Sequence, residues 1–179
     1  MKSNSNNDWT AAITSATKLS LMIAIVLIGT ITVIPMNVWA ATLYGTSGPD
    51  TIVGTNNADF INGLAGNDIL RGRGGNDNIY GEGGRDTITD GFGNDIVYSG
   101  PGNDKVTVTG IQRDNPDSNN KDIIYGERGA DNIDALNSER GSFLLIYGGD
   151  DDDTINGGSA SNHGIIYGDS GNDNIRVHE

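Results

Sequence analysis

Aspartate recurs every nine residues through the middle of this chain. The series continues with three aspartates at wider spacing, each two residues before an isoleucine. The regular members are Asp50, Asp59, Asp68, Asp77, Asp86, Asp95 and Asp104, and the later ones are Asp131, Asp153 and Asp173. Carboxylates are ligands that hard divalent cations prefer. The spacing therefore directs attention to cation binding by a repeated carboxylate.

Each aspartate belongs to a nine-residue unit, Gly-x-x-Gly-x-Asp-x-aliphatic-x. The aliphatic positions are Ile52, Ile61, Leu70, Ile79, Ile88, Val97 and Val106. Alternation along a strand places the aliphatic side chain on one face and its two neighbours on the other. The glycine- and asparagine-rich residues before it favour a tight turn. The unit predicts a short strand and a turn, and two units close one coil.

Stacked coils place alternate aspartates in two columns. We expect one column of Asp50, Asp68, Asp86, Asp104, Asp131, Asp153 and Asp173, and another of Asp59, Asp77 and Asp95. Carboxylates about 5 Å apart repel each other by on the order of 3 kcal/mol at an effective dielectric of about 20. A divalent ion held between turns relieves this repulsion. Calcium accepts carboxylate and carbonyl oxygens, whereas magnesium demands octahedral geometry and zinc prefers histidine or cysteine.

The units resemble the calcium-binding nonapeptide of the repeat-in-toxin (RTX) family, also called the hemolysin-type calcium-binding region. The resemblance covers residues 43–107 continuously and 125–176 with interruptions. It implies an all-β fold, a right-handed parallel β-roll, with each calcium ion shared between the turns of alternate units. It also implies carbonyl ligands from the turn glycines Gly63, Gly66, Gly72, Gly74, Gly75, Gly81, Gly83 and Gly84. If each ion needs two neighbouring turns, the roll holds at most about eight ions.

Several positions depart from this pattern. The second position of the unit is often not glycine, as at Thr46, Thr55, Leu64, Arg73, Glu82 and Glu127, and the fourth is Asn57 or Asp151 in two units. Longer connections are expected at 108–123, 135–144 and 157–165. Two registers stay open after Asp104, because Asp122 lies 18 residues beyond it and could continue the original series.

The first forty residues are of another kind. A polar start is followed by the uncharged apolar run from Leu19 to Ile34, then by proline and small residues up to Ala40. This order is typical of a secretory signal peptide. The alternative is an uncleaved N-terminal anchor, although the run is shorter than the roughly 20 residues that span a bilayer. Residues 41–179 are expected to form a single roll, secreted or held at the cell surface.

Composition restricts the function. The net charge of −13 argues against nucleic acid as a partner. The chain has no cysteine, and no constellation of residues suggests an enzyme. We expect an extracellular calcium-binding protein that folds on binding calcium and has a structural, adhesion or matrix role. A matrix or cell-surface polysaccharide, a protein or a second copy could be its partner.

The alternative is a calcium-dependent carbohydrate-active module, similar to a lyase or epimerase, or a carbohydrate-binding module. Its contacts would come from Arg113, Arg128 and Arg140, although these arginines could equally neutralise the acidic columns. The recurring tyrosines, Tyr98, Tyr125, Tyr147 and Tyr167, are expected to form an outward stacking ladder rather than a sugar platform.

Overall fold

The computed structural model describes residues 39–109, 121–137, 143–159 and 163–178, all within one compact unit. These residues form two parallel sheets of seven strands each. One sheet contains β1 (Thr42–Tyr44), β3 (Phe60–Asn62), β5 (Asn78–Tyr80), β7 (Ile96–Tyr98), β9 (Lys121–Arg128), β11 (Phe143–Asp150) and β13 (His163–Ser170). The other contains β2 (Thr51–Val53), β4 (Ile69–Gly74), β6 (Thr87–Phe92), β8 (Lys105–Thr109), β10 (Asn132–Asn137), β12 (Thr154–Ser159) and β14 (Asn174–His178). Within these ranges no helix is long and apolar enough to cross a membrane.

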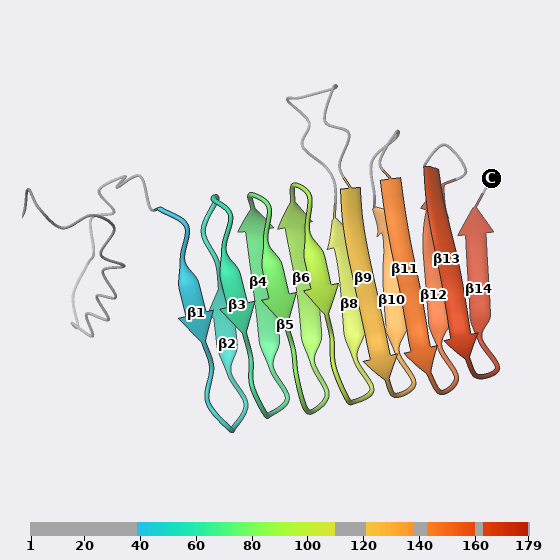
Figure 1. The fold of residues 1–179 in the computed structure, drawn as a ribbon, viewed down its shortest axis with the longest axis horizontal. Helices are drawn as coiled ribbons and strands as arrows, with labels where there is room; N and C mark the ends of the chain where they lie inside the picture. Colours follow the sequence, from blue (N-terminus) through green and yellow to red (C-terminus); the bar gives the residue numbers. More distant parts are fainter. Residues whose placement is uncertain (1–38, 110–120, 138–142, 160–162, 179) are drawn as a thin grey trace, which may run out of the picture. The chain divides into compact units, whose positions relative to one another are not determined.

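The chain winds as a parallel β-roll. Consecutive strands alternate between the two sheets, and each strand pairs with the strand one full coil away. In the regular part the coil is 18 residues long, as in the pairing of Thr51 with Ile69. Figure 1 shows the odd-numbered strands in front running downward and the even-numbered strands behind running upward as the chain advances, which is a right-handed coil. The predicted fold class is confirmed.

One row of aliphatic side chains from each sheet fills the space between the two sheets. Equivalent residues stack directly, so Ile61 pairs with Ile79 and Leu70 pairs with Ile88. The fully buried members include Ile61, Leu70, Ile79, Ile88, Val97, Val106, Ile124, Ile133, Ile146 and Ile155. At the first coils Leu43 and Ile52 are only partly buried against this core. The thin core matches the one aliphatic residue per unit that the sequence predicts.

The two ends of the strands differ. Short turns join every odd-numbered strand to the next even-numbered one, as seen at the lower edge of Figure 1. The three longer connections that the sequence predicts all fall after even-numbered strands, namely β8, β10 and β12. Strands extend into the predicted connections, because β8 continues to Thr109, β10 to Asn137 and β12 to Ser159. The remaining parts of those connections, and the predicted signal peptide apart from its last two residues, lie outside the described residues.

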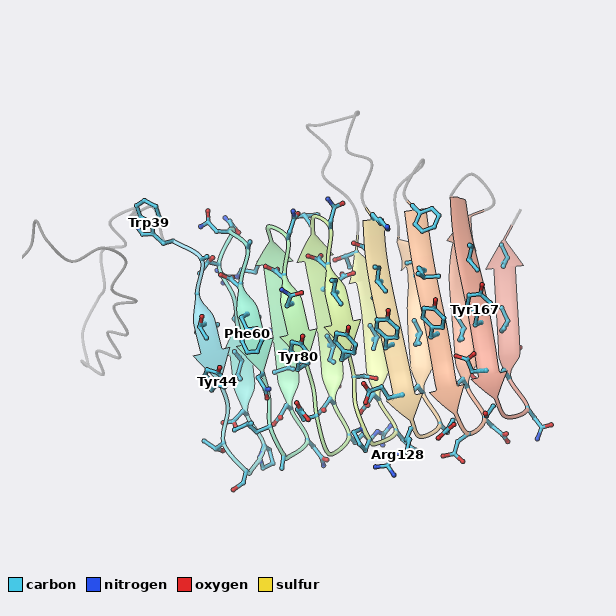
Figure 2. All side chains as sticks on the ribbon, in the orientation of Figure 1. Trp39, Tyr44, Phe60, Tyr80, Arg128 and Tyr167 are labelled. Carbon is cyan, nitrogen blue, oxygen red and sulfur yellow. The ribbon has the colours of Figure 1, made fainter. Side chains whose placement is uncertain are left out.

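Aromatic rings form a continuous ladder on the outer face of the odd-numbered sheet. Neighbouring ring centroids lie 4.7–5.7 Å apart. The members are Tyr44, Phe60, Tyr80, Tyr98, Tyr125, Tyr147 and Tyr167 (Figure 2). Asn62 occupies the ladder position of β3, and the ring of Phe60 fills the gap between Tyr44 and Tyr80. The four tyrosines that the sequence analysis singled out stack on one another, as predicted, whereas the contacts of Phe60 are tilted.

Where the first position of a turn is glycine, it has little room for a side chain. A Cβ atom added at Gly81 would meet the carbonyl oxygen of Ser99 in the next coil and Asp86 Oδ2 at 2.5 Å. A Cβ atom at Gly83 would meet nothing within 4 Å. We expect Gly81→Ala to lower the free energy of unfolding of the calcium-loaded protein by about 1–3 kcal/mol through overpacking, and Gly83→Ala to change it by less than about 0.5 kcal/mol.

Urea unfolding followed by circular dichroism measures both variants. Equal stability of the two would contradict the steric role of the first position.

Candidate metal centre

The first column contains seven aspartates linked from coil to coil by hydrogen bonds. The backbone N–H of each aspartate donates to Oδ1 of the aspartate in the next coil, at 2.7–3.0 Å. The column consists of Asp50, Asp68, Asp86, Asp104, Asp131, Asp153 and Asp173. These are the residues that the sequence predicted for this column.

The second column contains the same ladder on the opposite edge of the roll. Asp59 accepts from the N–H of Ala41, and the N–H groups of Asp59 and Asp77 donate to Asp77 and Asp95. The N–H of Asp95 then donates to Asp122 Oδ1 at 3.0 Å. Asp122 therefore continues the second column, which resolves the register that the sequence left open. The aspartate after Asp104 in the first column is Asp131.

The second oxygen of most column carboxylates is buried without a partner. Seven column aspartates have a buried Oδ2 that makes no hydrogen bond: Asp68, Asp77, Asp86, Asp95, Asp104, Asp131 and Asp153. At most 2 % of the surface of each of these residues is exposed. A buried carboxylate oxygen without a partner is costly in a folded protein. Its recurrence once per coil indicates a bound cation as the missing partner.

Backbone carbonyls approach the same oxygens. A Cβ atom added at Gly63 would lie 2.5 Å from Asp68 Oδ2 and 2.9 Å from the carbonyl oxygen of Gly81. The absence of a side chain thus leaves carboxylate and carbonyl oxygens facing one small space, and this is the donor set that calcium accepts. The carbonyl of Gly83, which was also predicted as a calcium ligand, already accepts a hydrogen bond from the N–H of Gly66 at 2.8 Å.

The first two turns are built differently. Thr46 donates to Asp50 Oδ2 through its N–H at 2.6 Å and its hydroxyl at 2.9 Å. Thr55 donates to Asp59 Oδ2 through its N–H at 2.5 Å and to Oδ1 through its hydroxyl at 3.0 Å. In these two turns threonine therefore supplies hydrogen bonds to the carboxylate. In most later turns the equivalent Oδ2 atom has no hydrogen-bond partner. The sequence analysis noted both threonines only as departures from glycine.

The backbone φ angle at the second position also differs between the first two turns and the later ones. At the equivalent second position of later turns, non-glycine residues have positive φ, as at Leu64 (72°), Glu82 (67°) and Glu127 (73°). Thr46 and Thr55 are not among the residues with positive φ. A β-branched side chain disfavours that conformation, and a hydroxyl two residues from a turn amide favours a hydrogen-bonded turn. This chemistry could have been read from the sequence.

Residues 44–79, 71–106, 118–137, 145–163 and 165–177 match the profile of the RTX calcium-binding nonapeptide repeat (4 copies). The chain belongs to this family. Its RTX repeats bind calcium in a structural role, as the sequence predicted. No curated protein sequence matches the chain.

The other candidate residues of the sequence analysis are placed as follows. Asp50 and Asp173 are half-buried at the two ends of the first column of the RTX roll. Arg128 is exposed (Figure 2), and Arg113 and Arg140 lie outside the described residues. The structure adds Asp90, which occupies the first position of its turn where Gly54 and Gly72 stand in earlier turns. Asp90 is fully buried, and its Oδ2 also has no partner.

Burial raises the pKa values of seven carboxyl groups in the RTX columns. Loss of hydration is the largest cause throughout, and the donated N–H of the preceding aspartate partly offsets it. The pKa of Asp77, Asp95 and Asp104 rises to about 7, and that of Asp131 to about 8. The pKa of Asp86, Asp122 and Asp153 rises to about 6. Without a metal ion, the folded roll thus favours protonated carboxyl groups.

These pKa values set the pH dependence of the metal-free protein. A raised folded-state pKa stabilises the fold at low pH, and this contribution is lost as the pH rises from about 4 through about 8. We expect the metal-free protein to have more β structure and a higher midpoint of urea unfolding at pH 5 than at pH 8. Calcium competes with protons for the same oxygens, so its apparent affinity should rise over this interval.

Circular dichroism of chelator-treated protein, dialysed into metal-free buffer at each pH, measures the first effect. Calcium titrations at the same pH values measure the second. Metal-free stability that rises with pH would contradict the assignment of the raised pKa values to the columns.

Proposed function

We propose that this protein is an extracellular calcium-binding protein whose RTX roll folds when calcium binds and then serves a structural role in adhesion or in a matrix. The observation that carries the proposal is the series of seven buried Oδ2 atoms without hydrogen-bond partners. Five of these atoms, those of Asp68, Asp77, Asp86, Asp131 and Asp153, lie beside a glycine whose missing side chain leaves room for an ion. The repeats therefore need cations to complete the fold.

The mechanism is linkage between binding and folding. The chain has a net charge of −13, and its aspartates repel one another when they are stacked and buried. Calcium that binds only the folded roll adds its binding free energy to the stability of the fold. Neighbouring ions share turns, so the transition is steep. Extracellular calcium modules commonly work at about 0.1–1 mM, which keeps the chain unfolded inside the cell and folds it outside.

Support for the extracellular location comes from the order of residues 1–40, with a polar start, an apolar run and small residues near Ala40. Secretion through a cleaved peptide and display through an uncleaved segment are both compatible with this order. Mass spectrometry of the protein recovered from the producing cells distinguishes them, because cleavage removes the first forty residues.

The ion count follows from the carboxylate oxygens. We assign calcium ligation to the seven column aspartates with an orphaned Oδ2. Asp50 and Asp59 already have their carboxylates hydrogen-bonded by threonine. This narrows the earlier expectation of at most about eight ions to about seven.

A calcium titration tests the folding switch. We expect a steep change from a disordered to a β-rich far-ultraviolet spectrum at about 0.1–1 mM calcium. Magnesium at the same concentrations should not produce it, because magnesium retains its waters and requires octahedral geometry. A protein that is fully folded in chelator would show that the aspartates act as turn formers and that calcium is incidental.

The proposed ligands are tested by Asp131→Asn with Asp50→Asn as the matched control. Asp131 has an orphaned Oδ2, whereas Asp50 Oδ2 accepts two hydrogen bonds from Thr46. We expect Asp131→Asn to bind one calcium ion fewer, or that ion on the order of 10–100-fold more weakly. Asp50→Asn should retain the wild-type count. Calcium counting by equilibrium dialysis decides, and equal losses in both variants would contradict the assignment.

The alternative of a carbohydrate-active or carbohydrate-binding module rests on the arginines and the aromatic ladder. The last four ring contacts of the ladder are stacked, with interplanar angles of 3–11°. Ring faces that cover one another leave little area for a sugar ring. Incubation of calcium-loaded protein with acidic polysaccharides tests this alternative, since new chain ends indicate cleavage and retention without cleavage indicates binding.

A further inference from the structure

The second column changes its construction after Asp95. The turn that contains Asp90 and Asp95 belongs to the last regular nine-residue unit on this edge, and the next carboxylate in the column comes from Asp122 at the start of β9. Asp122 lies 27 residues beyond Asp95. In the regular part, the next coil brings both an aspartate and a glycine-rich turn with its carbonyl groups. Here Asp122 brings the carboxylate, but the four residues 117–120 contain no glycine.

Asp90 places a third carboxylate at the same point. In the preceding turn of this column the first position is Gly72, and a Cβ atom there would approach Asp77 Oδ2, the orphaned oxygen of its own turn. Asp90 occupies the equivalent first position in the turn of Asp95. Its side chain therefore enters the space that the glycine of a regular turn leaves for an ion.

The three carboxylates converge. One oxygen of each of Asp90, Asp95 and Asp122 lies within 4.8 Å of the corresponding oxygen of the other two. The exposed fractions of the three residues are 0 %, 0 % and 2 %. Among the residues described, no lysine or arginine forms an ion pair with any of them. Three buried carboxylates without a counter-charge are unfavourable unless they are protonated or bind a cation.

Backbone N–H groups hold one oxygen of each carboxylate in place, and the other oxygen of two of them has no hydrogen-bond partner. Asp90 Oδ1 accepts hydrogen bonds from the N–H groups of Gly91 at 2.5 Å and Thr109 at 2.8 Å. Asp95 Oδ1 accepts from the N–H of Asp77, and Asp122 Oδ1 from that of Asp95. The Oδ2 atoms of Asp90 and Asp95 are buried and have no partner. The side chains are thus oriented before any ion binds.

We infer that Asp90, Asp95 and Asp122 form a three-carboxylate calcium site, in which side chains replace the carbonyl groups of the missing turn. Oxygens on opposite sides of a calcium ion, each about 2.3–2.6 Å from it, lie about 5 Å apart, which matches the spread of this cluster. The site joins β6 and β7 to β9 across the first long connection. It carries more carboxylate charge than the regular positions, so it fills at lower calcium concentration and releases its ion last.

This inference rests on the proposed calcium function, and calcium binding by the purified full-length protein separates the two. We expect wild type to bind one ion more tightly than the others in calcium titrations read by competition with a chromophoric chelator. Asp90→Asn, which retains the shape of the side chain, should weaken that ion on the order of tenfold or more. Asp152→Asn is the matched control, because Asp152 is exposed and outside both columns.

The outcomes are distinct. A wild type that binds no calcium would overturn the proposed function itself. A wild type that binds calcium and folds, with Asp90→Asn unchanged in both count and tightest affinity, would overturn the three-carboxylate site alone and would show that Asp90 is satisfied by a proton. Asp90→Gly, which restores the residue of the regular turns, repeats the test if Asp90→Asn does not fold.

A crystal of the wild-type protein soaked in terbium gives an independent measurement. We expect an anomalous peak between the three carboxylates, and a stronger one than at the regular turns because a trivalent ion matches three carboxylates. Peaks along the columns without one at Asp90 would overturn the inference.

Discussion

Repulsion between stacked, buried carboxylates is the constraint on which the rest of this structure depends. A parallel roll places equivalent residues of successive coils at the spacing between strands, and here the equivalent residue is aspartate. Its Oδ1 atom joins one coil to the next through a backbone N–H, while its Oδ2 atom is buried without a partner. A bound cation supplies that missing partner, and at low pH a proton relieves the same repulsion.

The thin core makes this dependence stronger. Each regular unit from Ile61 to Val106 contributes one fully buried aliphatic side chain, so the apolar surface that folding buries is small for the length of chain that must be ordered. The aromatic ladder adds ring stacking on one outer face only. Calcium binding therefore supplies stability that a thicker core supplies in other proteins.

The ends of the two columns show different solutions to one electrostatic problem. At the beginning of the roll, Thr46 and Thr55 donate hydrogen bonds to the carboxylates of their own turns, so a neutral donor takes the place that an ion takes elsewhere. At the end of the second column, where a long connection replaces the next short turn, Asp90 and Asp122 surround Asp95 with more negative charge. The proposed ion there would be held by side chains instead of turn carbonyls.

The repeat unit, the alternation of strand and turn, the row of buried aliphatic residues and the family can all be read from the amino-acid sequence. These features depend on local spacing, since a nine-residue unit fixes which side chain points inward and which turn carries the aspartate. The sequence also predicted the positions of ten column aspartates correctly. That each of these aspartates is a calcium ligand stays a prediction.

The contacts that form after the regular repeats end could be identified from the three-dimensional structure but not from the repeat pattern. The residue stacked on Asp95 depends on how the chain returns through a connection of irregular length, and the local pattern left a second register open at Asp122. The approach of Asp90 to that point likewise depends on a neighbouring coil. The nine-residue period predicts which residues stack only where the period is unbroken. Beyond it, contacts between coils determine which residues stack.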